Sequence, residues 1–224
     1  MTQSVRFRTP ARRSAKLQGD RIVTPELILA SASPRRREIL DRLGLAYRVH
    51  AASVEEETAD SKPEELTIRN ARLKTEAVAA IFPESVVLGA DTCVFLEGRL
   101  FNKPATREEA AFMLGRLSGK THHVVTGLCL AWKSRGRQWT GSVRSAVTFR
   151  SLTWETVRAY LEAVDPTDKA GGYGIQEQGE MLVASHRGSY TNIVGLPLEE
   201  TAAALASFGI PVPRGNLRMD PDGK

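Results

Sequence analysis

Residues 27–37 read Leu-Ile-Leu-Ala-Ser-Ala-Ser-Pro-Arg-Arg-Arg, and this stretch decides the fold class. Its first five residues form a short apolar run that suits a buried strand. Ser33 and Pro34 then supply a helix N-cap and a first helical residue, so the sequence predicts a helix over 34–43 that ends at Gly44. A strand that leads directly into a helix is typical of an α/β domain.

The alternation of strands and helices continues along the chain. Further strands are predicted over 86–92, 123–132 and 138–149. Further helices are predicted over 63–80, from Thr106 to about 118, from Thr153, and over 197–208. Because tight turns near 97–98 and 134–136 accompany longer crossover connections, we expect a mixed sheet.

The charge is distributed unevenly. The 224 residues carry a formal net charge of +5, from 31 Lys+Arg against 26 Asp+Glu. Five of the bases lie in residues 1–19, which contain no acid, and removing them leaves 26 bases against all 26 acids. The neutral remainder argues against a nucleic-acid-binding module driven by charge. We divide the chain into a basic extension over residues 1–25, a domain over residues 26–211 and a tail over residues 212–224.

The cysteine content and the lack of long apolar segments indicate where in the cell the protein is expected. Cys93 and Cys129 lie far apart in apolar surroundings, which suits buried thiols in a reducing compartment better than a disulfide. No window approaches the roughly 18 apolar residues of a membrane span, and the N-terminus lacks the apolar core of a secretory signal. We expect a cytoplasmic protein with no membrane partner. An organelle transit peptide is the alternative interpretation of the Arg-rich leader.

Three arginines at the start of a predicted helix are unusual on grounds of stability. Arg35, Arg36 and Arg37 lie where cations oppose the helix dipole, at a cost of about 0.3–1 kcal/mol each. A bound phosphate would make this arrangement favourable, because the helix N–H groups, the Ser33 hydroxyl and the guanidinium groups all offer hydrogen-bond donors to it. A solvated basic patch is the alternative, and it suits Arg37, which has Asp41 one turn away. We favour a phosphate site for Arg35 and Arg36.

An acidic residue follows the apolar run at 86–90. Asp91 is expected at the C-terminal end of a buried strand, the edge where open α/β sheets bind ligands. A carboxylate there can hold a divalent metal or orient an attacking water, with Glu56 as a second oxygen ligand. On spacing alone, capping of a turn through Thr92 has equal weight. Lys74 and Lys103 can each contact phosphate or face solvent.

Two familiar nucleotide motifs are excluded. Residues 115–121 resemble a P-loop but have three residues between the glycines where that motif needs four. Residues 172–174 lack the third glycine of a dinucleotide fingerprint. The chain therefore offers neither a P-loop nor a Rossmann nucleotide site.

Several blocks of sequence together resemble the Maf family of nucleoside triphosphate pyrophosphatases. They occur in the family's order over about residues 27–208. The blocks are Leu29–Arg37, Gly89–Thr92, Lys103-Pro104, Leu117–His122 with Thr126-Gly127, Lys169–Gln176 and Gly195–Pro197.

The resemblance implies a fold, a reaction and a set of site residues. It implies an α/β fold of the Maf and ITPase kind, with two lobes around a deep nucleotide cleft, that forms a homodimer. It implies hydrolysis of a nucleoside triphosphate to the monophosphate and pyrophosphate with Mg²⁺ or Mn²⁺. The family's general base falls on Asp91. Its phosphate-binding and specificity residues fall on Ser33, Arg35, Arg36, Thr92, Lys103 and Gln176, with Glu56 and Lys74 at further cleft positions.

The same resemblance bears on the substrate. Gly174-Ile175-Gln176 is similar to the branch that acts on dTTP and UTP, and an amide can offer both a donor and an acceptor to a pyrimidine edge. Glu177 departs from the family, since glycine is common there, and this bears on the base preference. We expect Asp91 and Glu56 to hold the metal, and whether Asp91 also takes the proton stays open. A Maf-type enzyme with another base preference and a non-catalytic nucleotide-binding regulator of cell division are the alternatives.

Overall fold

A mixed sheet of seven strands forms the centre of the molecule. The computed structural model describes residues 24–58 and 62–213. Its strands lie in the order β2-β1-β3-β5-β6-β7, with β4 also paired to β3. The strands are β1 (Leu27–Leu29), β2 (Arg48–Val49), β3 (Val86–Leu96), β4 (Arg99–Phe101), β5 (Thr121–Trp132), β6 (Arg137–Phe149) and β7 (Val183–Arg187). β1 is parallel to β2 and β3, and the other pairs are antiparallel, which confirms the predicted mixed sheet.

The longer helices lie where the sequence predicts them. The helices are α1 (Pro34–Arg42), α2 (Pro63–Ile81), α3 (Arg107–Leu117), α4 (Trp154–Ala163), α5 (Gly179–Leu182), α6 (Tyr190–Val194) and α7 (Leu198–Ser207), with 3₁₀ turns η1 (Lys133–Arg135) and η2 (Ala170–Gly172). Thr106 and Thr153 cap α3 and α4 with their side chains, as predicted. The sequence did not predict β2, β7, α5 and α6. Most of the predicted basic extension and C-terminal tail lies outside the described residues, so both stay predictions.

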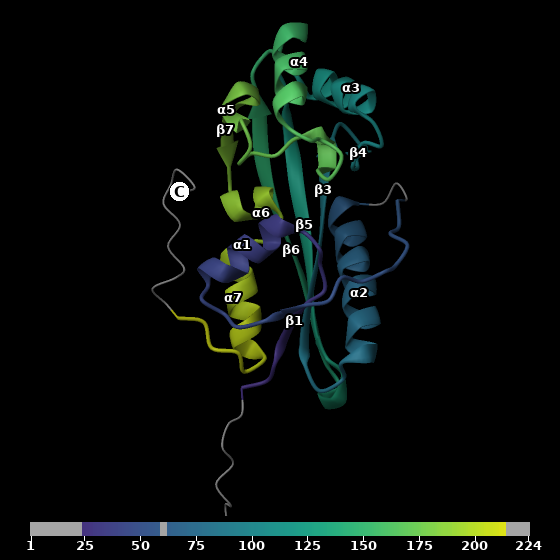
Figure 1. Cartoon of the computed structure of the whole chain (residues 1–224), viewed down its shortest axis with the longest axis vertical. Helices are drawn as coiled ribbons and strands as arrows, with labels where there is room; N and C mark the ends of the chain where they lie inside the picture. The colour runs from purple at the N-terminus through teal and green to yellow at the C-terminus, as the bar shows by residue number, and fades with distance from the viewer. Residues whose placement is uncertain (1–23, 59–61, 214–224) are drawn as a thin grey trace, which may run out of the picture.

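The hydrophobic core has one cluster in each of two lobes, and a third, smaller cluster lies between α2 and the sheet. The long strands β3, β5 and β6 run through both lobes in Figure 1, with α1 and α7 against the lower half and α3, α4 and α5 around the upper half. Leu29, Leu40 and Leu88 belong to the lower core, whereas Val94 and Phe149 belong to the upper core. Because β3 contributes side chains to both cores, the same sheet extends through both lobes.

Helix α2 lies directly against the other face of the sheet. A Cβ atom on Gly127 of β5 would lie 2.3 Å from the carbonyl carbon of Thr67 in α2. A Cβ atom on Gly89 of β3 would lie 2.7 Å from the carbonyl oxygen of Ala71. Since only glycine lets the helix backbone approach this closely, these two positions set the depth of α2 on the sheet.

One prediction about β3 is wrong. Asp91 was expected where its strand ends, but β3 continues to Leu96 because it forms a hairpin with β4. β1 pairs with 86–88 and β4 with 94–96, so no described strand pairs with this edge of β3 in between. Asp91 therefore lies just beyond the end of β1, in a gap along the sheet edge where a ligand can approach the strand.

Replacement of Gly127 by alanine tests the close contact of α2. We expect Gly127→Ala to lower the free energy of unfolding by about 1–3 kcal/mol or more, because the new methyl group meets helix backbone that cannot rotate away. Gly115→Ala is the matched control, since that glycine lies in α3 with open space around it, and it should be neutral or slightly stabilising. Urea denaturation of both variants measures the difference, and an unchanged midpoint for Gly127→Ala would contradict the contact.

A buried histidine makes stability depend on pH. The His122 side chain is fully buried, with Nε2 2.6 Å from the Tyr173 hydroxyl and the Phe149 ring edge-on against it. Burial lowers the pKa of His122 from 6.5 to about 3. The unfolded chain therefore binds a proton between pH 6.5 and about 3 that the folded chain does not bind. This contribution to stability is complete above pH 6.5 and declines as the pH falls below it.

His122→Gln should flatten that pH dependence. From this group alone we expect the wild-type chain to lose about 2 kcal/mol of unfolding free energy between pH 7.5 and pH 5. The glutamine variant should lose less over the same range, and His123→Gln should keep the wild-type slope. Chemical denaturation at several pH values is the measurement. An identical slope in His122→Gln would show that His122 is not the group responsible.

Candidate active site

A cavity of about 240 Å³ lies at the gap along β3, with lining residues from both lobes. Its wall includes α1 and α2 on one side and the segment 168–176 on the other. All nine sequence-predicted site residues line it: Ser33, Arg35, Arg36, Glu56, Lys74, Asp91, Thr92, Lys103 and Gln176. Residues that are 143 positions apart in the chain thus meet at one place, with acidic and basic groups together.

Asp91 is held by two donors from α2. Its side chain is about nine-tenths buried, and Oδ1 accepts from Lys74 Nζ at 2.7 Å while Oδ2 accepts from Asn70 Nδ2 at 3.1 Å. Asn70 and Lys74 lie four positions apart, so the two side chains share one helix face. The Asp91 carboxylate therefore does not cap a turn, which was the alternative that the spacing allowed.

Lys74 joins two carboxylates. Its Nζ lies 2.9 Å from Glu56 Oε1 as well as 2.7 Å from Asp91 Oδ1. Partial burial acts to raise the pKa of Glu56, but the charge and hydrogen bond of Lys74, with Lys103 and Arg36 nearby, outweigh it and lower that pKa. Glu56 therefore stays ionised beside Asp91.

Arg36 is bound within the protein. Its Nε donates to the Gly195 carbonyl at 2.9 Å, and its two terminal nitrogens donate to Ser31 Oγ at 3.0 Å and Thr92 Oγ1 at 3.1 Å. Burial lowers the pKa of Arg36, while the charges of Asp91 and Glu56 act in the opposite direction. Arg36 ties the start of α1 to β3 and to the α6–α7 connection, and contributes positive charge to the cavity wall.

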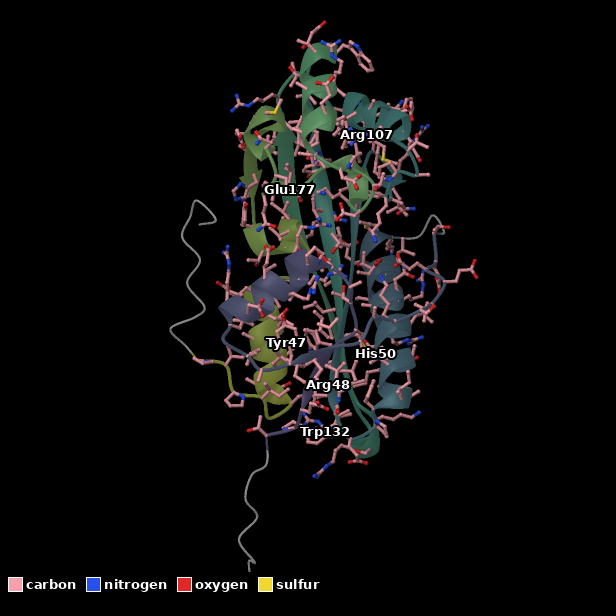
Figure 2. The ribbon with its side chains drawn as sticks, viewed as in Figure 1. Tyr47, Arg48, His50, Arg107, Trp132 and Glu177 are labelled. Atoms are coloured by element: carbon pink, nitrogen blue, oxygen red, sulfur yellow. The ribbon has the colours of Figure 1, made fainter. Side chains whose placement is uncertain are left out.

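Arg35 reaches across the cavity to the opposite lobe. Its terminal nitrogens donate to Asp168 Oδ2 at 2.8 Å and to the Asp168 carbonyl at 3.1 Å, and Glu177 Oε1 lies 3.6 Å away. Figure 2 shows Glu177 above α1, in the upper lobe. Lys169 Nζ contacts the same two acids, at 2.7 Å from Asp168 and 3.1 Å from Glu177. In this state Arg35 has carboxylate partners that a phosphate group could replace.

The remaining predicted residues line the rim and the entrance. Lys103 and Gln176 are exposed and line the cavity. Ser33 lies at the N-cap of α1 as predicted, but its side chain does not make the expected capping hydrogen bond. Ser33 lines the cavity.

A cysteine in the cavity wall is not a nucleophile. Cys93 is 2% exposed, and burial, with the nearby charge of Asp91, raises its pKa to about 12. The thiol therefore remains protonated at neutral pH, and the thiolate is the reactive form. Covalent chemistry at Cys93 is excluded.

The acidic pair fits a divalent metal. Glu56 and Asp91 already face one positive charge, the Lys74 ammonium, and carboxylate oxygens are the donors that Mg²⁺ takes together with substrate phosphates. Over the described ranges 24–58 and 62–213, no group of three His, Cys, Asp or Glu side chains is placed to hold a metal. A metal here would therefore need oxygen atoms from the substrate as well as from the protein.

Three functional residues were not predicted from the sequence. Asn70 contacts Asp91 and Asp168 contacts Arg35, whereas Lys169 contacts Asp168 and Glu177. Asn70 could have been found from the sequence, since it lies one helical turn before Lys74 and so on the same helix face. Lys169 begins a block shared with the family and Asp168 lies just before it, but the pairing of Asp168 with Arg35 joins residues 133 positions apart and leaves no local pattern.

Comparison with known proteins identifies the family. The model of the family described as Maf-like protein matches residues 26–208. The chain belongs to the Maf family. A protein of Syntrophus aciditrophicus (strain SB) named dTTP/UTP pyrophosphatase is 44% identical over 189 residues, covering 84% of this chain and 92% of the relative. A protein of Moorella thermoacetica with the same name is 46% identical over 188 residues, covering 84% and 97%.

A solved structure of a Ham1 protein from Coxiella burnetii is also similar, at 15% identity and a TM-score of 0.49, covering 82% of this chain and 99% of that one. In the described part of this Maf protein, none of the helices combines the length and the apolar character needed to cross a membrane.

Arg35 can be tested with an inorganic anion. Each charge-assisted hydrogen bond is worth about 1.5–3 kcal/mol, so Arg35→Ala should weaken binding of inorganic tripolyphosphate roughly 10- to 100-fold. Arg37→Ala is the matched control, because Arg37 lies in the same helical turn but is exposed and does not line the cavity. Isothermal titration calorimetry gives both dissociation constants. Equal affinities in the two variants would remove Arg35 from the phosphate site.

Proposed function

We propose that this Maf protein hydrolyses dTTP and UTP to the nucleoside monophosphate and pyrophosphate. The observation that carries the proposal is that one cavity brings an acidic pair, Asp91 and Glu56, together with the cations Arg35 and Lys103. The relatives named dTTP/UTP pyrophosphatase, 44–46% identical over most of the chain, support the choice of substrate.

The basic groups would bind the triphosphate. Arg35 would exchange the Asp168 carboxylate for phosphate oxygens, which present the same kind of acceptor to the guanidinium group. Lys103 lies at the rim and would contact the phosphates as a mobile point charge. Arg36 keeps its protein partners and would add to the positive potential at the start of α1.

The acidic pair would carry the chemistry. A water oxygen would attack the α-phosphorus, forming the new P–O bond while the bond to the bridging oxygen breaks and pyrophosphate leaves. Asp91 is placed to accept the proton of that water, or to hold a metal, and Asn70 and Lys74 fix its carboxylate in either role. A bound Mg²⁺ or Mn²⁺ held by Asp91 and Glu56 would neutralise charge on the phosphates. The reaction needs positioning and charge stabilisation and no covalent intermediate.

The exposed amide of Gln176 would select the base. It lies on the cavity wall after the Gly174-Ile175 step, so it can offer both a donor and an acceptor to a thymine or uracil edge. Glu177 fixes this segment by its contacts with Lys169 and Arg35. Gln176 would thereby determine a preference for pyrimidines over purines.

The proposal also covers the location, the oligomeric state and the partners of the enzyme. We infer from the family resemblance that it acts in the cytoplasm as a homodimer, without a nucleic-acid or membrane partner. Light scattering after gel filtration tests the dimer, and a monomeric mass across the micromolar range would contradict it.

Asp91→Asn tests the reaction. The amide keeps the shape of the side chain but cannot take a proton or supply a full negative charge, so we expect kcat to fall by about 100-fold or more while the protein stays folded. Glu55→Gln, an exposed neighbour of Glu56 that does not line the cavity, should keep wild-type kcat. Pyrophosphate release from dTTP, UTP, CTP, ATP and GTP, each with Mg²⁺ or Mn²⁺, measures turnover and base preference together.

Two outcomes would overturn the proposal. Absence of pyrophosphate release by the wild-type protein with every nucleotide would indicate a binding protein without turnover. Release by Asp91→Asn at the wild-type rate would remove Asp91 from the chemistry.

A further inference from the structure

We infer that Asn70 is a positioning residue for this reaction, which holds Asp91 and the segment carrying Glu56 in one fixed arrangement. The inference rests on the proposed function, because it assigns Asn70 a role in that same site. No step of the hydrolysis itself requires an amide at this place.

Asn70 lies at the point where α2 meets both acidic residues. It is 3% exposed, lies one turn before Lys74, and is part of the cavity wall. Gly127 of the neighbouring strand β5 pairs with Asp91 and lets α2 approach the sheet at Thr67. A side chain as short as asparagine can therefore reach the carboxylate from the helix.

The three hydrogen bonds of Asn70 fix the orientation of its amide. The Glu57 N–H donates to Asn70 Oδ1 at 2.8 Å, so this atom must be the oxygen. Nδ2 then donates one hydrogen to the Glu57 carbonyl at 3.0 Å and the other to Asp91 Oδ2 at 3.1 Å. The amide thus pairs with the backbone of Glu57 as a neighbouring strand would, and points its remaining donor at Asp91.

This pairing adds a backbone contact between two parts of the site that charged side chains also join. Residues 51–58 have neither helical nor strand structure, and Glu56 immediately precedes the residue that Asn70 holds. Lys74 binds the Glu56 side chain, and Arg69 binds the Glu57 side chain at 2.7 Å, but Asn70 binds the Glu57 backbone. The position of the Glu56 carboxylate relative to Asp91 therefore depends on the amide.

Only an amide of this length meets both requirements. Aspartate at position 70 would keep the acceptor for the Glu57 N–H but would turn a second oxygen toward the Glu57 carbonyl and Asp91 Oδ2. Leucine would fill the volume but would remove both hydrogen bonds to the Glu57 backbone as well as the donor to Asp91. The two substitutions separate the loss of the donor from the loss of both hydrogen-bonding functions.

The test compares Asn70→Asp and Asn70→Leu with the wild type in the full-length protein. We expect kcat for dTTP to fall at least 10-fold in both variants, with KM changed less than about 3-fold, because the triphosphate contacts are untouched. The Mg²⁺ concentration that gives half-maximal rate should rise in both. Hydrogen–deuterium exchange of the peptide that contains residues 53–58 should become faster in Asn70→Leu, without substrate or metal. Arg72→Gln, on the exposed side of α2, should match the wild type in all of these measurements.

The outcomes separate this inference from a merely structural role. A structural asparagine would lower the melting temperature and leave kcat of the folded protein unchanged, and that result would overturn the inference. If either variant fails to fold, Asn70→Ser replaces it, because a smaller side chain introduces no clash and cannot hold both Glu57 and Asp91. Wild-type kcat and wild-type exchange in Asn70→Ser would also overturn it. Failure of the proposed function is distinct, since the wild-type protein would then release no pyrophosphate in the same assay.

Discussion

The direct contact between the α2 backbone and two glycines of the sheet determines where the acidic residues lie. Gly127 and Gly89 leave no side chain between helix and strand, so α2 lies close enough for Asn70 and Lys74 to reach Asp91. A helix at the ordinary distance from the sheet would leave the Asp91 carboxylate without these donors, and a buried carboxylate without partners is costly. The close contact of the α2 backbone with these two glycines thus determines both how the helix packs on the sheet and which donors reach Asp91.

The arginines at the start of α1 serve two different purposes. Arg36 donates to oxygens from three separate segments, and so it fixes the geometry around the β3 gap. Arg35 is paired with Asp168 from the opposite lobe, in a partly exposed ion pair whose net contribution to stability is small. The pKa of Asp168 is lowered. Partial burial acts to raise it, but the hydrogen bonds from Lys169 and Arg35 outweigh that effect, so the carboxylate is ionised. A weak ion pair across a cleft is easily exchanged for a phosphate, whereas the three hydrogen bonds of Arg36 to different segments are not.

Strong local signals explain what the sequence predicted. Pro34, Thr106 and Thr153 start helices for reasons of local chemistry, and the structure begins α1, α3 and α4 there. The end of β3 was misjudged because Asp91 and Thr92 interrupt the apolar run, although polar residues within a strand are compatible with a ligand site at its edge. Contacts between distant segments, such as Arg35 with Asp168 or Asn70 with Glu57, leave no local pattern. The short β2 and β7 are mostly exposed, so they lack an apolar signature.

Lys74 resolves an electrostatic conflict in the cleft. A triphosphate is strongly anionic, and two carboxylates facing it would repel it by several kcal/mol at the effective dielectric constant of a protein surface. The Lys74 ammonium lies between Glu56 and Asp91 and cancels one of their two charges, while it keeps Glu56 ionised. One net negative charge remains, which is enough to attract a divalent cation but small beside the positive charge of Arg35, Arg36 and Lys103. The attraction for a polyanion is therefore described by this local balance better than by the net charge of +5 for the whole chain, which the sequence assigns to residues 1–19.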